Sequence, residues 1–223
     1  MTEKEVDEYL SEKEQIERIR AWWKENGAWI IVGVGVGILG LAGWNWWQSH
    51  KLTQAQEASA VYASLSSAAG SGQIDEARSE LERLAGDYGG TPYLQQGRLA
   101  LAAALVEAER SDEAADLLAQ VMNEADDPEL SLVARLRLAR LLASTGQADR
   151  ALEVATVANP GTFGSALNEV RGDVLAARGD TDAAREAYQA ALDGVAEGGV
   201  VDEAFVRMKL EALGGAAAES STS

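Results

Sequence analysis

A glycine pattern near the N-terminus is the first place where residue types and spacing could do chemistry. Gly35, Gly37 and Gly40 match the spacing G-x-G-x-x-G within the stretch IVGVGVGILGLAG, residues 31–43. In dinucleotide-binding proteins such glycines let a phosphate approach the backbone between a strand and an amphipathic helix. Here a charged helical segment precedes the glycines and tryptophans follow them. The surroundings therefore argue against a nucleotide site.

Other patterns of catalytic or metal-binding residues are weak in this chain. It has one histidine, His50, and no cysteine, so sites built on those residue types lack their components. The adjacent carboxylates Asp126 and Asp127 precede Pro128 and indicate a turn. No nucleophile, base and orienting residue fall into a known motif. We predict that the protein is not an enzyme and binds no cofactor or metal.

The charge balance limits the classes of partner. The 223 residues include 36 acidic and 19 basic side chains, for a formal net charge of −17. Such a surface repels the phosphates of nucleic acids, so we expect no nucleic-acid partner. The many alanines and leucines, with only three prolines, favour helices.

Residues 28–47 have the length and composition of a membrane span. They are 20 positions without a charged residue, and a helix of that length covers about 30 Å, the thickness of the hydrocarbon layer. Tryptophans, which favour the membrane–water interface, flank it at Trp22, Trp23, Trp29, Trp44, Trp46 and Trp47. The acidic segment before it and the lack of a nearby cleavage site are unlike a signal peptide, which predicts a retained transmembrane helix.

The glycines of this span offer a face for helix packing. Gly33, Gly37 and Gly40 recur at i, i+4 and i+7, on one side of a helix. Small residues at this spacing allow a second membrane helix to approach closely. Glycine is also common in membrane helices generally, and the partner could be a second copy or another membrane protein. These alternatives stay open.

Basic residues predict the orientation of the span. Four of them precede it at Lys13, Arg18, Arg20 and Lys24, whereas only Lys51 follows it closely. The excess of basic residues places the N-terminus in the cytoplasm and the larger C-terminal part on the far side.

Residues 1–27 would then form a cytoplasmic amphipathic stub. Ile16, Ile19 and Trp23 recur at helical spacing among charged residues. The stub could lie on the membrane surface or dock a cytoplasmic partner. Asn26 and Gly27 predict a break before the span.

The remainder of the chain contains internal repeats. Four turn-then-helix segments each carry an alanine at the same place, with separations of 37, 37 and 33 residues: Ala77, Ala114, Ala151 and Ala184. These separations are close to the 34-residue period of tetratricopeptide repeats, in which two antiparallel helices form each unit. We therefore predict an all-α protein: a single N-terminal transmembrane helix followed by a tetratricopeptide-like α-hairpin solenoid of about four hairpins. The solenoid would cover residues 48–213, and a disordered tail residues 214–223.

Large and small residues recur around these alanines. Nine residues before three of them lie Leu105, Leu142 and Leu175; small residues three positions earlier are Ala102, Ala139 and Gly172; and Leu118, Ala155 and Tyr188 follow four residues after the alanine. The pattern departs from a strict repeat at Ala68, Ala155 and Arg171.

Stacked hairpins present a concave groove lined by their leading helices. The repeat register places eight residues on it: Leu99, Ala103, Val106, Val133, Leu136, Arg140, Glu169 and Asp173. A surface of mixed apolar and charged side chains suits a peptide segment or a partner's loop. The alternative is that several of these residues only pack against neighbouring helices.

Several stretches, in their order and spacing, resemble the family of ancillary subunits of the bacterial Sec translocon, the YfgM family. They are QIERIRAWWKENG, GWNWWQSH, LRLARLLASTGQADRAL, VRGDVLAARGD and MKLEAL, and the match extends over residues 12–213. The resemblance implies a bacterial inner-membrane protein with one span and a periplasmic tetratricopeptide-like domain. It also implies association with the SecYEG channel and with a membrane-anchored periplasmic chaperone of the PpiD type.

We therefore expect a non-enzymatic, type II inner-membrane adaptor or chaperone that binds the periplasmic chaperone, emerging client polypeptides, or both. The alternative is a self-associating envelope scaffold unrelated to secretion, such as a homodimer. Gly33 and Gly37 would serve both functions, so the sequence does not separate them.

Overall fold

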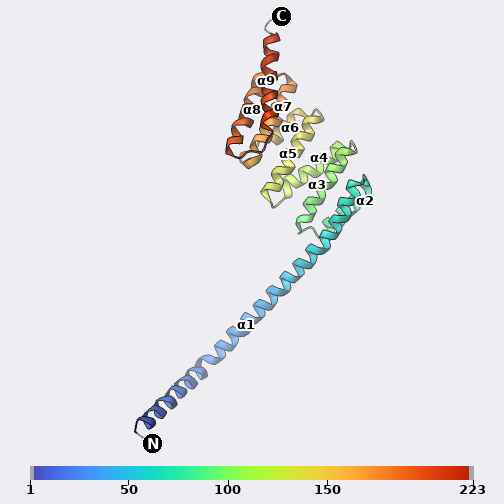
Figure 1. The fold of residues 1–223 in the computed structure, drawn as a ribbon. Helices are drawn as coiled ribbons and strands as arrows, with labels where there is room; N and C mark the ends of the chain where they lie inside the picture. The colour runs from blue at the N-terminus through green and yellow to red at the C-terminus, as the bar shows by residue number, and fades with distance from the viewer. Residues whose placement is uncertain (1–2, 221–223) are drawn as a thin grey trace. The chain divides into compact units, whose positions relative to one another are not determined.

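The computed structural model describes residues 3–220 and contains only helices and their connections there (Figure 1). The prediction of an all-α fold is confirmed. The chain divides into two compact units, Met1–Gln56 and Glu57–Ser223.

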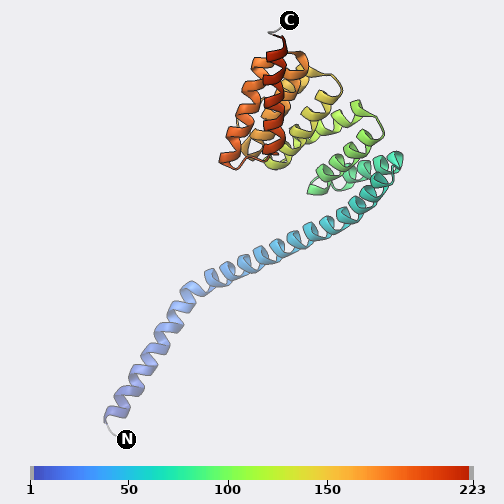
Figure 2. The same ribbon diagram turned by 45° about the horizontal axis from the view of Figure 1, so that its top comes forward.

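A single helix, α1 (Glu3–Gly70), carries the predicted stub, the predicted span and the leading helix of the first hairpin. The predicted break at Asn26 and Gly27 is wrong. The Asn26 amide donates to the carbonyl of Trp22 at 3.0 Å, one turn back, and so shares a helix carbonyl while the helix continues. Gly27 is covered by the indole of Trp23. A glycine inside a helix costs about 1 kcal/mol, which the long helix tolerates; Figure 2 shows that α1 bends but continues.

Within the described residues, one helix is long and apolar enough to cross a membrane, the segment Ile16–Gly70. Only 6% of its most apolar window is buried. The apolar side chains therefore lack the protein cover that a core helix of a soluble protein has. The helix fits a single-pass membrane anchor, as predicted for residues 28–47.

Four hairpins build the second unit, each from a leading and a following helix. The end of α1 pairs with α2 (Ile74–Asp87), α3 (Pro92–Glu107) with α4 (Ser111–Glu124), α5 (Pro128–Ser144) with α6 (Ala148–Ala155), and α7 (Gly164–Arg178) with α8 (Thr181–Asp193). The short helices η1 (Gly161–Phe163) and η2 (Gly194–Glu197) lie in the connections. Helix α9 (Glu203–Ser220) packs against α8. The predicted tetratricopeptide-like solenoid of about four hairpins is confirmed.

The recurring alanines explain how the hairpins close. Ala77, Ala114, Ala151 and Ala184 are each fully buried at 0% exposure. A methyl group at this place lets the two helices of a hairpin approach closely, whereas a larger side chain would force them apart.

Each hairpin turn uses one backbone conformation. The second-last residue before the following helix has a positive φ: 72° at Gly72, 60° at Glu109, 75° at Gly146 and 83° at Gly179. The next amide donates back to a carbonyl five residues earlier, as Arg110 does to Leu105 at 2.8 Å and Gln147 to Leu142 at 2.8 Å. This is the Schellman arrangement that ends a helix in a left-handed residue. Three of the turns therefore need their glycine, and one uses glutamate.

Helix α9 ends at Ser220 and so includes part of residues 214–223, the predicted disordered tail. Residues 221–223 of that segment, and residues 1–2 of the predicted stub, lie outside the described residues. Disorder of the tail stays a prediction.

Candidate functional site

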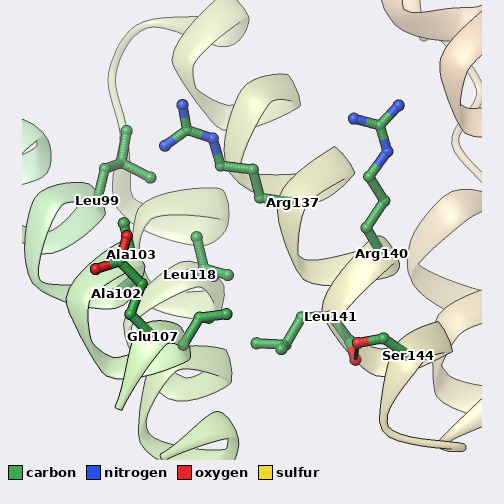
Figure 3. A pocket seen from close by; sticks show the side chains of 10 residues that line it. Leu99, Ala102, Ala103, Glu107, Leu118, Arg137, Arg140, Leu141 and Ser144 are labelled. Atoms are coloured by element: carbon green, nitrogen blue, oxygen red, sulfur yellow. Dashed lines mark hydrogen bonds between the residues drawn. The ribbon is translucent and has the colours of Figure 1, made fainter. Parts of the chain in front are cut away.

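A first hollow of the solenoid lies between α3 and α5, with α4 beneath it (Figure 3). Its volume is about 590 Å³. Most of its lining is apolar, and the polar groups come chiefly from α5. The lining residues are Leu99, Ala102, Ala103, Val106, Glu107, Leu118, Arg137, Arg140, Leu141 and Ser144.

A second hollow of about 490 Å³ continues along the same face between α5 and α7. Arg140 and Ser144 line both hollows. Val170, Asp173 and Val174 contribute from α7. The two hollows therefore form one strip across three leading helices, which we call the α3–α5–α7 groove.

The structure distributes the eight sequence-derived groove residues over several environments. Leu99, Ala103, Val106 and Arg140 line the first hollow, and Asp173 lines the second. Leu136 belongs to the core at 9% exposure, Val133 is half-buried, and neither lines a hollow. Glu169 is 8% exposed and is engaged inside the fold. Binding by any of them stays a prediction.

Sequence reasoning missed Arg137, Leu141 and Ser144 on α5. The repeat register gave neighbouring helices equivalent positions, so it placed Leu136 where α3 has Leu99. The hollow, however, lies between α3 and α5. The two helices line it with sides that are not equivalent in the repeat register. Spacing of i, i+3, i+4 and i+7 from Arg137 marks the α5 side of the hollow and could have indicated these residues.

A charged cluster that includes Asp173, a residue lining the second hollow, joins α7 to α9. The Lys209 ammonium lies 2.8 Å from Glu169 Oε1 and 2.7 Å from Asp173 Oδ1. The Tyr188 hydroxyl donates to Asp173 at 2.7 Å. Burial, followed by this hydrogen bond and the charges of Asp173 and Glu169, raises the pKa of Tyr188, so the phenol stays protonated. These carboxylates are satisfied within the fold and help to fix α9 on the last hairpin.

Comparison with known proteins gives the family. A family model described as a tetratricopeptide repeat-like domain matches residues 20–215. The chain is 32% identical over 206 residues to the ancillary SecYEG translocon subunit of Aggregatibacter actinomycetemcomitans, covering 92% of this chain and 98% of that protein. The chain belongs to the family of ancillary SecYEG translocon subunits. The resemblance inferred from sequence is thereby confirmed.

Two further members of the ancillary SecYEG translocon subunit family match at similar levels. The protein of that name from Escherichia coli is 32% identical over 184 residues, covering 82% of this chain and 88% of its own length. The one from Haemophilus influenzae is 30% identical over 212 residues, covering 92% and 98%. Both alignments cover most of this chain.

The glycine face of this family member is open. Gly33, Gly37 and Gly40 are exposed on α1, and a Cβ at any of them would meet no atom within 4 Å among the described residues. The backbone is therefore accessible to another helix along this side. Packing there stays a prediction.

The part of this ancillary-subunit chain that the structure describes holds no group of three His, Cys, Asp or Glu side chains placed to bind a metal ion. Ancillary SecYEG translocon subunits are not known as a family of enzymes. That this chain is not an enzyme stays a prediction. The absence of a cofactor stays a prediction.

Proposed function

We propose that this chain is a membrane-anchored, non-enzymatic adaptor and chaperone of the Sec translocon. Relatives named ancillary SecYEG translocon subunits support this, because they align over both the apolar helix and the solenoid. The observation that carries the proposal is the combination of that membership with an open groove on a domain tied to a membrane helix.

The proposed location is the bacterial inner membrane, with the N-terminus in the cytoplasm and the solenoid in the periplasm. The basic residues that precede the span support this orientation, since the positive-inside rule holds for short flanking segments. In this orientation the groove faces the compartment into which translocated chains emerge.

The proposed binding region is the α3–α5–α7 groove. The apolar floor of its first hollow comes from three helices, α3, α4 and α5, and Val106 remains 43% exposed at the edge. Such a surface suits an extended polypeptide with apolar side chains. The proposed occupants are segments of a membrane-anchored periplasmic chaperone of the PpiD type and of emerging client polypeptides.

Site-specific photo-crosslinking tests this proposal in native membranes. A photoreactive amino acid at Val106 reports on the groove, and the same amino acid at Gln120, exposed on α4 outside both hollows, is the matched control. We expect adducts with Sec channel subunits, the chaperone or secreted chains at position 106 and few at 120. Equal patterns at both positions would contradict binding in the groove.

A second candidate function is a self-associating envelope scaffold. The exposed glycine face of α1 favours it, because two copies could pack there as readily as two different helices. Crosslinks at position 37 between two copies, with none to the channel, would support the scaffold.

A further inference from the structure

Two arginines stand beside the apolar floor of the first hollow. Arg137 and Arg140 are exposed on α5 and are three residues apart, so they project from neighbouring places on one side of the helix. Figure 3 shows both side chains extending upward in the view, Arg137 leaning toward Leu99, with Leu118 and Leu141 below them. The hollow therefore combines an apolar surface with two guanidinium groups at its α5 edge.

These arginines lack the strong partners that other arginines have. Within the described residues Arg137 makes no ion pair or hydrogen bond, and Arg140 reaches only Glu169 Oε2 at 3.6 Å, while Lys209 already holds the other carboxylate oxygen at 2.8 Å. Most other solenoid arginines pair closely with a carboxylate: Arg78, Arg98, Arg110, Arg178, Arg185 and Arg207. The chain has 36 acidic residues, yet these two groove arginines have no close carboxylate partner among the described residues. Their guanidinium groups are therefore available to a ligand.

From this arrangement we infer that the groove selects extended polypeptide segments in which an acidic side chain is flanked by apolar ones. This rests on the proposed function, whose binding region it specifies. A guanidinium binds a carboxylate through two parallel hydrogen bonds, and the apolar floor shelters the neighbouring side chains from water. Glu107, the carboxylate that lines the first hollow, belongs to α3. It repels an acidic side chain of the bound segment on that side, so such a side chain is favoured only along α5.

The acidic residue is internal to the bound segment, not its C-terminus. Arg140 lies between the two hollows, which provide about 590 Å³ on one side and about 490 Å³ on the other. A segment with its carboxylate at Arg140 can place apolar side chains in both. A C-terminal carboxylate at the same place would leave one hollow empty.

Peptide binding to the full-length chain in detergent micelles tests the inference. The probes are fluorescent nine-residue peptides with apolar flanks and a central Glu, Gln or Lys, all with an amidated C-terminus. A fourth peptide has a central Gln and a free C-terminal carboxylate. Binding is measured by fluorescence anisotropy at low and high salt.

We expect the central-Glu peptide to bind about tenfold more tightly than the Gln peptide, because charge-assisted hydrogen bonds are stronger than neutral ones. The Lys peptide should bind most weakly, and salt should reduce the advantage of Glu. Replacing both arginines, Arg137→Gln with Arg140→Gln, should remove the preference for the Glu peptide over the Gln peptide. Arg150→Gln, on the exposed side of α6, is the matched control and should change neither.

The outcomes separate this inference from the proposed function. Equal binding of the Glu and Gln peptides overturns the inference while peptide binding itself stands. If the peptide with a free C-terminal carboxylate binds most tightly, the inference that the acidic residue is internal to the bound segment is overturned. Binding of none of the four peptides, with the helical content of the protein intact, overturns both proposals.

Discussion

The phenol ring of Tyr188 on α8 lies directly against the backbone of Gly172 on α7. A Cβ at Gly172 would come within 2.5 Å of ring carbon Cδ1. Tyr188 is 3% exposed and its hydroxyl is held by Asp173. The ring thus occupies the volume that any larger residue at position 172 would need, and the last hairpin depends on this small–large pair.

The Gly172→Ala variant should be less stable. Overpacking costs about 1–3 kcal/mol, whereas the better helix propensity of alanine returns about 1 kcal/mol, so the net free energy of unfolding should fall. Gly86→Ala in α2 is the matched control, because a Cβ there meets no atom within 4 Å. Denaturant unfolding would contradict the account if both variants gained stability alike.

Replacing Glu109 with glycine should stabilise the turn between α3 and α4. Glu109 has a φ of 60° where the equivalent turns use glycine, and a side chain in that conformation costs about 1 kcal/mol. We expect Glu109→Gly to raise the midpoint of thermal unfolding. Gly146→Ala, in the equivalent turn, should lower it. An unchanged or lower midpoint for Glu109→Gly would show that its turn is not strained.

The ion pairs of Glu113 should make the stability depend on pH. Arg110 Nε donates to it at 2.6 Å and Arg78 Nη2 at 2.6 Å, and these bonds, the one from Arg110 foremost, lower the pKa of Glu113. A carboxyl whose folded pKa lies below its unfolded value contributes stability above the unfolded pKa, and that contribution is lost as pH falls through the folded pKa. Arg78 comes from α2 and Arg110 from the turn before α4, so the effect joins two hairpins.

The Glu113→Gln variant measures this contribution. Its unfolding midpoint should lie below that of the parent at neutral pH, and the two should converge as the solution is acidified below the usual carboxyl range. Asp112→Asn, a change at the exposed neighbouring residue, is the control and should not reproduce this convergence. A constant difference at all pH values would mean that the ion pairs do not act on stability.

The glycine face can be tested with the same substitution on two sides of one helix. Gly37→Ile places a bulky side chain on the predicted packing face and should weaken association with membrane partners. Gly35→Ile makes the same change on the opposite side and should have little effect. Recovery of partners by affinity purification from detergent extracts is the measurement. Equal losses in both variants would remove the glycine face from the account.

The repeat pattern of the solenoid was readable from the sequence because its signals are local. Ala77, Ala114, Ala151 and Ala184 are forced to be small by helix contact within one hairpin, and each lies five residues after the left-handed residue of the turn before it. Local steric requirements therefore appear in the sequence as small residues at regular spacing. The break expected at Asn26 and Gly27 failed because helix-breaking residues lower helix stability only slightly when no proline is present.

The groove was harder to predict because it depends on how hairpins rotate against each other. Leu136 and Arg137 are adjacent in sequence, yet one belongs to the core and the other to the hollow. A register error of one residue turns a helix by about 100°. The capture of Glu169 and Asp173 by Lys209 is a contact between residues 36 and 40 positions apart, which repeat spacing does not encode.

Mild-detergent purification of the full-length chain, with mass spectrometry of the proteins that accompany it, decides between an adaptor and a scaffold. We expect recovery of Sec channel subunits together with a membrane-anchored periplasmic chaperone. Recovery of the chain alone, as a self-associated species from membranes that contain an intact channel, would contradict the proposed adaptor. It would leave the family membership as a shared fold without a shared function.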